Sequence, residues 1–319
     1  MGVPVSGSVE VAPDFGRFAD TEGHQFEFAR VEHPGGRGLV VHLSAFFGDW
    51  GEARRYRENF RGYFHRLRML GSSPDHSWLF LYDGFGAYDN GCYYLGRAGD
   101  LFVERAVMEI VRQEMERLGI GPDEVVTVGS SMGATGALVM GLRLGAAGIV
   151  TVSPHIDLDR AATLCQRHAE VAYACPDGDP TSTASEAVTR RVRRLLSGYS
   201  ADRPPPRLFV QACTDDAGVY PEQVPSLAEE WEARGRRVDL DLRPEGGHTS
   251  DFATRPLLLD VIARYLGDEP ADIEAYQRDA RFSGTLTRPS PWATALVTVR
   301  RRLRLRHRWN ATVGRVRRR

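Results

Sequence analysis

The chain has 319 residues, of which 42% are hydrophobic and 26% charged, and this composition excludes collagen-like, coiled-coil and wholly disordered proteins. No apolar run approaches the roughly 18 residues that a membrane-spanning helix needs, so we do not expect an integral membrane protein. The net charge of −1 hides an asymmetry: the tail from Arg300 to Arg319 holds 10 Arg and no acid, whereas the other 299 residues hold 31 Arg and 42 acids. We therefore expect no specific binding of nucleic acid, because the body of the chain lacks a basic field.

The predicted elements begin with weak strands between Ser8 and Val31, around the turn-rich segment ADTEG. Further strands are predicted from compact or alternating apolar runs at residues 38–46, 77–83, 124–129, 148–153, 207–213 and 237–243. Helices are predicted between them at residues 52–70, 101–118, 132–144, 158–169, 185–196, about 225–234 and 255–266. This alternation predicts an α/β fold with a mostly parallel central sheet flanked by helices, whose chemistry gathers at the carboxyl ends of the strands.

The sharpest motif is GSSMG, residues 129–133, which has the form GxSxG, follows the strand VVTV and opens a helix. The glycines allow a tight strand-to-helix turn that exposes Ser131 as a nucleophile. The backbone N–H of Met132 then lies at a helix N-terminus, where it can stabilise an oxyanion. The alternative is a tightly packed glycine turn without chemistry. A P-loop is excluded because the chain contains no Lys.

A serine hydroxyl needs a base to take its proton and an acid to orient that base. His248 follows the predicted strand RVDLDLR in the loop PEGGHTSD, and it is the expected base. His155, in SPHID, is either a second candidate base or a residue that lines the pocket. The acid should follow the strand RLFVQAC, where Asp215 and Asp216 stand in CTDDAGVY. We favour Asp216 and keep Asp215 as the alternative.

These residues resemble the α/β-hydrolase superfamily over roughly residues 38–266, since the elbow GSSMG, the late acid in CTDD and the GGH histidine occur in that family's order. The resemblance implies a second oxyanion donor at the turn after the strand VVHLS, from the backbone N–H of Ala45 or Phe46, and we assign Phe46. The turn reads LSAFFGD and departs from the family's HG or HGGG pattern.

A narrower resemblance rests on YDGFGAYDNGCYYLGRAGDLFVERAV followed by the GSSMG elbow. It is similar to hydrolase-like proteins of bacterial surface-glycopolymer and accessory-secretion systems, some of which transfer or remove acyl groups on glycans. This resemblance implies that Tyr93 and Tyr94 lie beside Ser131 and contact the substrate. Packing in the core is the other interpretation of both tyrosines.

The domain organisation is predicted as one α/β-hydrolase domain at residues 1–268, with a cap insertion at about 155–203, and a C-terminal extension at residues 269–319. The Arg-rich end of that extension is a candidate for binding an anionic membrane surface or polymer. The basic segment TRRVRRLL in the cap is either a solvated helix face or a contact for an acidic polymer.

The first residues, MGVPVSGSVEVAPDFG, contain neither a basic nor an apolar signal segment, so we expect a cytoplasmic protein, with a peripheral membrane location as an alternative. The four cysteines (Cys92, Cys165, Cys175 and Cys213) have no CxxC spacing and form no zinc-type cluster, so reduced thiols are expected.

The predicted function is a serine esterase or deacylase that acts on a small-molecule or glycan acyl substrate through an acyl-enzyme. An acyltransferase to a sugar hydroxyl or an amine is the alternative, and a non-catalytic scaffold that binds an anionic partner is the second alternative. No metal and no organic cofactor are expected.

Overall fold

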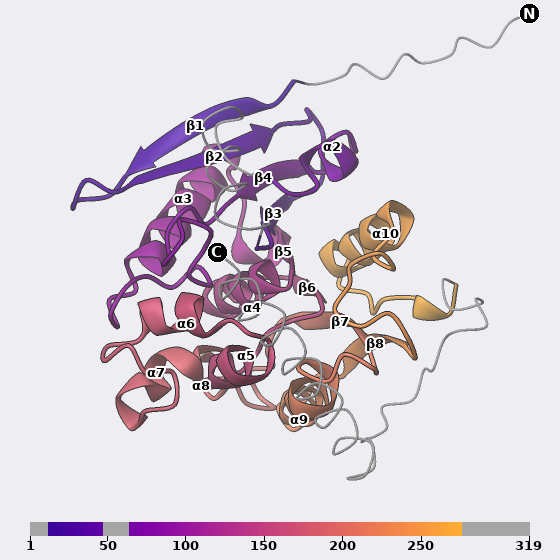
Figure 1. Ribbon diagram of the computed structural model, residues 1–319. Helices are drawn as coiled ribbons and strands as arrows, with labels where there is room; N and C mark the ends of the chain where they lie inside the picture. The colour runs from indigo at the N-terminus through magenta and orange to yellow at the C-terminus, as the bar shows by residue number, and fades with distance from the viewer. Residues whose placement is uncertain (1–11, 47–63, 276–319) are drawn as a thin grey trace, which may run out of the picture.

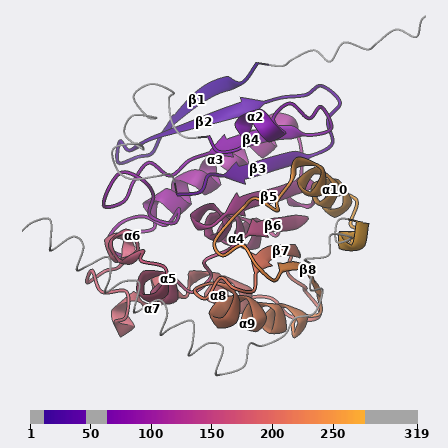
Figure 2. The same cartoon turned by 45° about the vertical axis from the view of Figure 1, so that its right-hand side comes forward.

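The fold is built on one eight-stranded sheet (Figure 1). The computed structural model describes residues 12–46 and 64–275. The strand order is β1-β2-β4-β3-β5-β6-β7-β8, so the first and last strands form the two edges (Figure 2). Strands β1 (Asp14–Ala19) and β2 (Gln25–Val31) form an antiparallel hairpin at one edge, and β2 pairs antiparallel with β4. The other strands are parallel: β3 (Leu39–Leu43), β4 (Ser77–Leu81), β5 (Val125–Ser130), β6 (Gly148–Val152), β7 (Arg207–Cys213) and β8 (Val238–Arg243).

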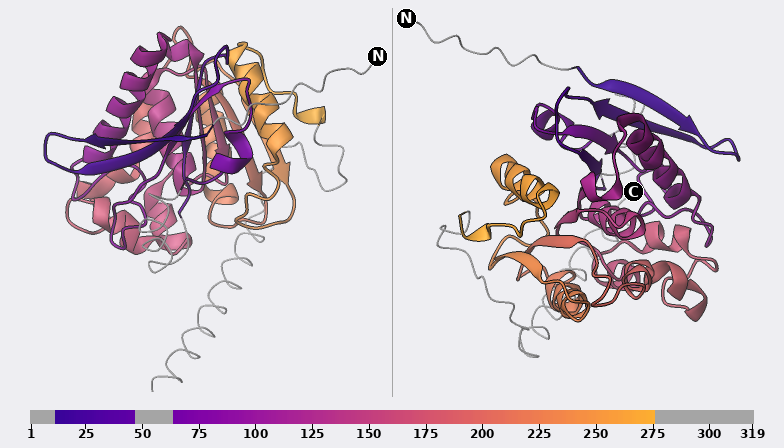
Figure 3. Two further views of the ribbon diagram at one scale, coloured as in Figure 1. Left: turned by 90° about the horizontal axis from the view of Figure 1, so that it is seen from above. Right: turned by 180° about the vertical axis from the view of Figure 1, so that it is seen from behind.

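Helices cover both faces of this sheet, as the view from above shows (Figure 3). One face packs against α3 (Phe102–Leu118), α4 (Met132–Leu144) and α9 (Tyr220–Glu232). The other face packs against α2 (Leu67–Leu70) and α10 (Arg255–Leu266). A mostly parallel sheet buried on both faces is what the continuous apolar strands predicted. No helix within the two described ranges is long and apolar enough to cross a membrane.

The segment predicted as a cap consists of short helices beside α4, seen at the lower left of Figure 1: α5 (Leu158–Leu164), α6 (His168–Ala174), the 3-10 turn η2 (Thr183–Ser185), α7 (Glu186–Thr189) and α8 (Arg191–Leu196). Each of the two helices predicted here is therefore divided in the structure. The first division lies at Gln166, whose φ of 60° is incompatible with a continuing right-handed helix. The second lies at Arg190, with φ −106° and ψ 23°.

Two other predicted helices agree with the structure only in part. Helix α9 begins at Tyr220, five residues before the predicted start, because Pro221 occupies its first turn and Pro225 lies inside it. Proline favours the first turn of a helix, and the sequence offers two prolines that could mark that start. Of the helix predicted at 52–70, residues 52–63 lie outside the described residues, and α2 is the part that the structure describes.

Two predicted segments at the chain ends also lie wholly or almost wholly outside the described residues. The predicted strand segment SVEVA lies almost wholly outside the described residues, and the described hairpin instead uses residues 14–19 and 25–31. The Arg-rich tail lies wholly outside them. The division into a domain at 1–268 and an extension at 269–319 stays a prediction. The described start of the extension contacts the sheet, because the Ala271 N–H donates to Asp239 Oδ2 at 2.9 Å.

Candidate active site

Ser131 lies on a sharp turn between β5 and α4, at the carboxyl edge of the sheet. Its backbone has φ 53° and ψ −117°, a conformation that non-glycine residues rarely adopt. A Cβ at Gly129 would lie 2.0 Å from the carbonyl oxygen of Gly133, and one at Gly133 would lie 2.2 Å from the carbonyl oxygen of Leu43. Both glycines of the motif are therefore required by close backbone approach, as the GxSxG interpretation predicted.

Three side chains from three separate loops form one hydrogen-bonded chain at this turn. His248 Nε2 lies 2.8 Å from Ser131 Oγ, and His248 Nδ1 lies 2.7 Å from Asp216 Oδ2. The Asp216 carboxylate accepts, so Nδ1 carries the proton of the neutral ring and Nε2 is left to accept from the serine hydroxyl. The Asp216 side chain is 9% exposed and that of His248 is 37% exposed, so the acid is covered and the base is open to solvent.

The two neighbouring aspartates have different contacts in the structure. Asp216 lies against His248, whereas Asp215 accepts hydrogen bonds from the N–H groups of Gly246 and Gly247 at 3.2 and 2.8 Å. Asp215 thereby shapes the glycine turn that carries His248, and both glycines have positive φ. The geometry matches the preference for Asp216, while the catalytic role of each residue stays a prediction.

The two predicted oxyanion donors belong to the start of α4 and to the segment after β3. Met132 is the first residue of α4, so its N–H is at a helix N-terminus. Phe46 lies three residues past the end of β3, and Gly133 packs against the backbone of that strand end. The guanidinium carbon of Arg167 lies 4.2 Å from the centre of the Phe46 ring. The donor roles of Met132 and Phe46 stay predictions.

Tyr93, Tyr94 and His155, the predicted substrate-binding residues, are buried: their exposed fractions are 1%, 0% and 1%. Tyr94 Oη donates to the carbonyl oxygens of Ser44 and Leu81 at 3.0 and 3.2 Å. Tyr93 Oη lies 3.0 Å from His155 Nδ1, and the His155 ring stacks on His248. All three side chains are therefore covered by other residues, and their contact with substrate stays a prediction.

Sequence reasoning did not assign a role to Asp83, which holds the loop with both tyrosines. Its buried carboxylate accepts the N–H groups of Cys92, Tyr94 and Phe85 at 2.7, 2.8 and 3.2 Å. Burial raises the pKa of Asp83, and these three backbone hydrogen bonds oppose that rise. The signal available in the sequence was an aspartate at the end of the strand predicted at 77–83, followed directly by a glycine-rich loop.

Three of the four arginines of the basic segment TRRVRRLL form ion pairs with carboxylates of the described residues. Arg191 binds the buried carboxylate of Glu104 at 2.6 Å, and Arg193 binds Asp157 at 2.7 Å. Arg190 lies 2.9 Å from the same Asp157. These arginines tie the short helices to the body of the fold, and this arrangement argues against the acidic-polymer interpretation.

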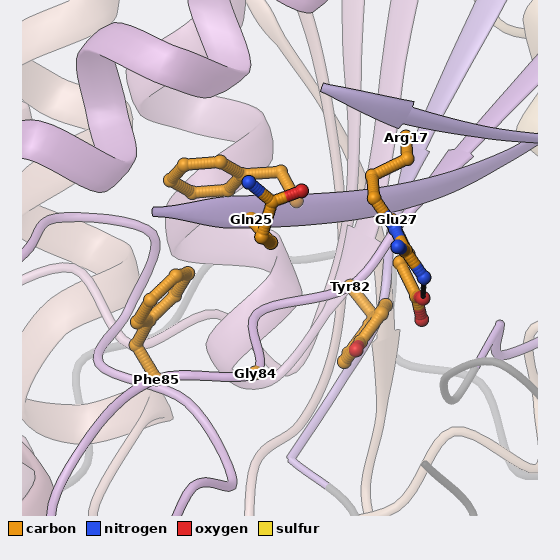
Figure 4. A pocket seen from close by; sticks show the side chains of 7 residues that line it. Arg17, Gln25, Glu27, Tyr82, Gly84 and Phe85 are labelled. Carbon is orange, nitrogen blue, oxygen red and sulfur yellow. Dashed lines mark hydrogen bonds and ion pairs between the residues drawn. The ribbon is translucent and has the colours of Figure 1, made fainter. Parts of the chain in front are cut away.

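A hollow of about 360 Å³ lies apart from the triad, between the hairpin and the loop after β4 (Figure 4). Its lining combines the ion pair Arg17–Glu27 with Gln25, Phe26, Tyr82, Gly84 and Phe85. None of the three triad residues lines it.

No family model matches the chain. A protein of the accessory Sec system of Staphylococcus aureus is 27% identical over 146 residues, which make up 46% of this chain and 24% of that protein. This chain thus spans about a quarter of the length of that relative.

Solved structures of low sequence identity share the fold. A chain of the glycosylation-associated protein (Gap123) complex of Streptococcus agalactiae matches 84% of this chain over 48% of its own length, with a TM-score of 0.60 and 16% identity. The capsule O-acetyltransferase of Neisseria meningitidis serogroup A matches 77% of this chain over 93% of its own, with a TM-score of 0.59 and 15% identity. The acylaminoacyl peptidase of Pyrococcus horikoshii matches 84% over 44%, with a TM-score of 0.57 and 12% identity. At such identities the likeness establishes a shared α/β fold alone.

Proposed function

We propose that this chain is a serine enzyme that removes an acyl group from an ester, with an O-acylated glycan as the expected substrate. The observation that carries the proposal is the continuous hydrogen-bonded chain from Ser131 through His248 to Asp216 at a GxSxG turn. The likeness to an O-acetyltransferase and to a peptidase supports a fold that suits acyl chemistry. The accessory Sec relative and the Gap123 neighbour support a link to protein secretion and glycosylation.

The proposed reaction has two halves. Ser131 Oγ attacks the acyl carbon while His248 Nε2 takes the hydroxyl proton, and the resulting oxyanion accepts hydrogen bonds from the N–H of Met132 and of Phe46. The intermediate collapses when the bond to the leaving oxygen breaks and His248 returns the proton to that oxygen. In the second half, water loses a proton to His248 and attacks the acyl-serine. The bond between the acyl carbon and Ser131 Oγ then breaks, the carboxylic acid leaves, and His248 returns the proton to Ser131 Oγ.

Transfer to a sugar hydroxyl is the close alternative, because an acceptor hydroxyl can replace water in the second half. Within the part of the chain that the structure describes, the His248 side chain is 37% exposed, so water can reach the site. This access favours hydrolysis. The shared fold with the capsule O-acetyltransferase supports transfer. Acetate release from an O-acetylated glycan, measured beside acetyl transfer from an activated ester to the deacetylated glycan, distinguishes the two reactions.

The test of the proposal is labelling of the purified chain with a fluorophosphonate, followed by peptide mapping. We expect labelling at Ser131 in the wild type, no labelling at this position in Ser131→Ala, and a labelling rate at least a hundredfold lower in His248→Ala. The matched control is Ser130→Ala, which removes the adjacent hydroxyl, one that accepts from Arg66 Nη1 at 2.9 Å. Equal labelling of wild type and His248→Ala would contradict an activated serine.

A second candidate function is that of a non-catalytic component of a glycosylation or secretion assembly. The similarity to an accessory Sec system protein and to a chain of the Gap123 complex favours it, since both are named as parts of such systems. A folded chain that neither labels at Ser131 nor hydrolyses activated esters, but assembles with a partner protein, would establish this function instead. The tail from Arg300 to Arg319 stays a predicted contact for an anionic surface.

A further inference from the structure

Behind the open face of His248 lies a buried pair of side chains that the proposed reaction does not use. Tyr93 Oη lies 3.0 Å from His155 Nδ1, and each of the two side chains is 1% exposed. The pair joins two elements, because Tyr93 belongs to the loop after β4 and His155 follows β6. The phenol and the imidazole ring centres are 5.8 Å apart.

The His155 ring lies flat against the ring of His248. The two centres are 5.1 Å apart and the planes differ by 13°. Both nitrogens of His248 are engaged within its own plane, one by Asp216 and one by Ser131. These two hydrogen bonds do little to stop the imidazole ring from rotating about the axis that joins its two nitrogens, because each nitrogen stays close to its partner during that rotation. A flat contact on one face restrains that motion.

His155 is itself firmly held by its backbone. Its carbonyl oxygen accepts from Thr135 Oγ1 at 2.5 Å. The next two N–H groups, of Ile156 and Asp157, donate to Gln223 Oε1 at 2.7 and 2.8 Å. The turn after β6 is therefore fixed to helices α4 and α9, so the ring that it carries is a rigid support.

The ring of His155 is also held in its neutral form. Burial lowers the pKa of His155 well below its ordinary value, and His248 and the Arg167 guanidinium add to the effect. These two groups and the Tyr93 hydroxyl are the titratable or charged neighbours that face it. A neutral aromatic face tolerates the imidazolium that forms on His248 during acyl transfer, whereas a second cation would repel it.

We infer that Tyr93 and His155 form a neutral platform that holds the His248 ring in the plane of Ser131 and Asp216. His155 acts through His248 and is a positioning residue. Tyr93 positions His155 in turn, because its hydroxyl is the hydrogen-bond partner of Nδ1. The inference rests on the proposed function insofar as His248 is the base of that reaction, but the geometric claim is measurable without any substrate.

The test uses three variants of the full chain. His155→Ala removes the platform, and Tyr93→Phe removes its anchor. The double variant Tyr93→Phe/His155→Phe restores a flat ring without leaving a buried polar atom unpaired. Tyr199→Phe is the matched control, because it removes a tyrosine hydrogen bond to a backbone carbonyl, that of Leu142, away from the site.

Two quantities are measured in each variant. The first is the low-field proton NMR resonance of the Asp216–His248 hydrogen bond, which requires no activity. The second is kcat and KM for 4-nitrophenyl acetate. For His155→Ala we expect the resonance to broaden or disappear and kcat to fall about tenfold with little change in KM, since misplacing a catalytic group costs rate more than binding. For Tyr93→Phe we expect kcat to fall about threefold, and the double variant should recover most of the loss.

An unchanged resonance and an unchanged kcat in His155→Ala would overturn the inference. So would equal losses in His155→Ala and in the double variant, because a flat ring would then not be what matters. If wild type neither labels nor hydrolyses the ester, the proposed function fails, and the resonance still decides whether the platform positions His248. If His155→Ala does not fold, Tyr93→Phe and the double variant carry the same comparison.

Discussion

Asp215 and Asp216 are adjacent in the chain, yet they contact different parts of the same loop. We expect Asp216→Asn to lower kcat on an activated ester by about 10³–10⁴-fold, because the amide cannot hold His248 in the tautomer that accepts from Ser131. Asp215→Asn keeps an oxygen that can still accept from the N–H of Gly246 or Gly247, so a loss below about tenfold is expected. Steady-state kinetics on both variants measures the difference, and the reverse order would assign the acid to Asp215.

The candidate site shows which residue contacts a sequence can predict. The GxSxG spacing and the chain order of acid and histidine predicted the three residues that the structure brings together. The contacts of Tyr93 and His155 could not be predicted, because they depend on two consecutive tyrosines at φ 62° and 58° that turn the loop inward. Positive φ at a bulky residue is imposed by tertiary contacts and leaves no local pattern in the sequence.

Strand β3 and helix α4 meet at the elbow so closely that Gly133 has no room for a methyl group. A Cβ there would meet two backbone oxygens, those of Leu43 at 2.2 Å and Ser44 at 2.8 Å. We expect Gly133→Ala to destabilise the fold by about 1–3 kcal/mol and to reduce fluorophosphonate labelling, because α4 must move away from β3. Gly198→Ala is the control, since its nearest contact would be 3.3 Å away. Urea unfolding of both variants measures the cost, and equal stability would contradict the close approach.

Helix α8, one of the short helices beside α4, is tied to α3 and α4 by a buried carboxylate. Glu104 of α3 is 0% exposed and binds Arg143 of α4 and Arg191 of α8, both at 2.6 Å. We expect Glu104→Gln to cost about 2–3 kcal/mol in the free energy of unfolding, below the full cost of a buried unpaired charge because both arginines reach solvent.

The control for Glu104 is an ion pair at the surface. Glu27→Gln breaks the contact with Arg17, whose side chain is 66% exposed, and should cost less than about 1 kcal/mol. Chemical unfolding monitored by circular dichroism gives both values. A Glu104→Gln variant as stable as Glu27→Gln would show that α8 is held by its apolar contacts instead.

The boundaries of the last two strands were predicted closely. The strands at 207–213 and 237–243 match β7 and β8 within one residue, because a continuous apolar or alternating run ends where the sheet ends. The divided helices at 158–169 and 185–196 could not be predicted, since their breaks at Gln166 and Arg190 carry no Gly or Pro. In the second of these segments, Arg190 and Arg191 pair with Asp157 and Glu104, and hydrophobic periodicity does not reveal such pairing.

At the scale of the whole molecule, parallel pairing gathers loops that are distant in the chain. Ser131, Asp216 and His248 follow β5, β7 and β8, and the carboxyl ends of these strands lie at one edge of the sheet. The sequence predicted this gathering from the alternation of strands and helices. It did not predict the antiparallel pairing of β2 with β4, because the residues of neither strand indicate which strand lies beside it.

The stability of the whole chain should fall on acidification, because several histidines are buried in their neutral form. Burial lowers the pKa of His42 and His155 well below 6.5, that of His65 to about 4, and that of His76 by a smaller amount. His42 is fully buried, and neither of its ring nitrogens has a hydrogen-bond partner among the described residues. The unfolded chain therefore binds more protons than the folded chain once the pH drops below about 6.5.

The expected slope follows from that difference in bound protons. Each histidine that protonates in the unfolded state alone contributes about 1.4 kcal/mol per pH unit, so the free energy of unfolding should decrease steeply between pH 6.5 and 5. Asp83 and Asp241, whose pKa values burial raises, oppose this trend at lower pH because the folded state then takes up their protons first. Urea unfolding from pH 8 to 5 measures the slope, and His42→Phe should flatten it because one neutral buried histidine is removed. A stability that is constant across this range would contradict the neutral burial of these rings.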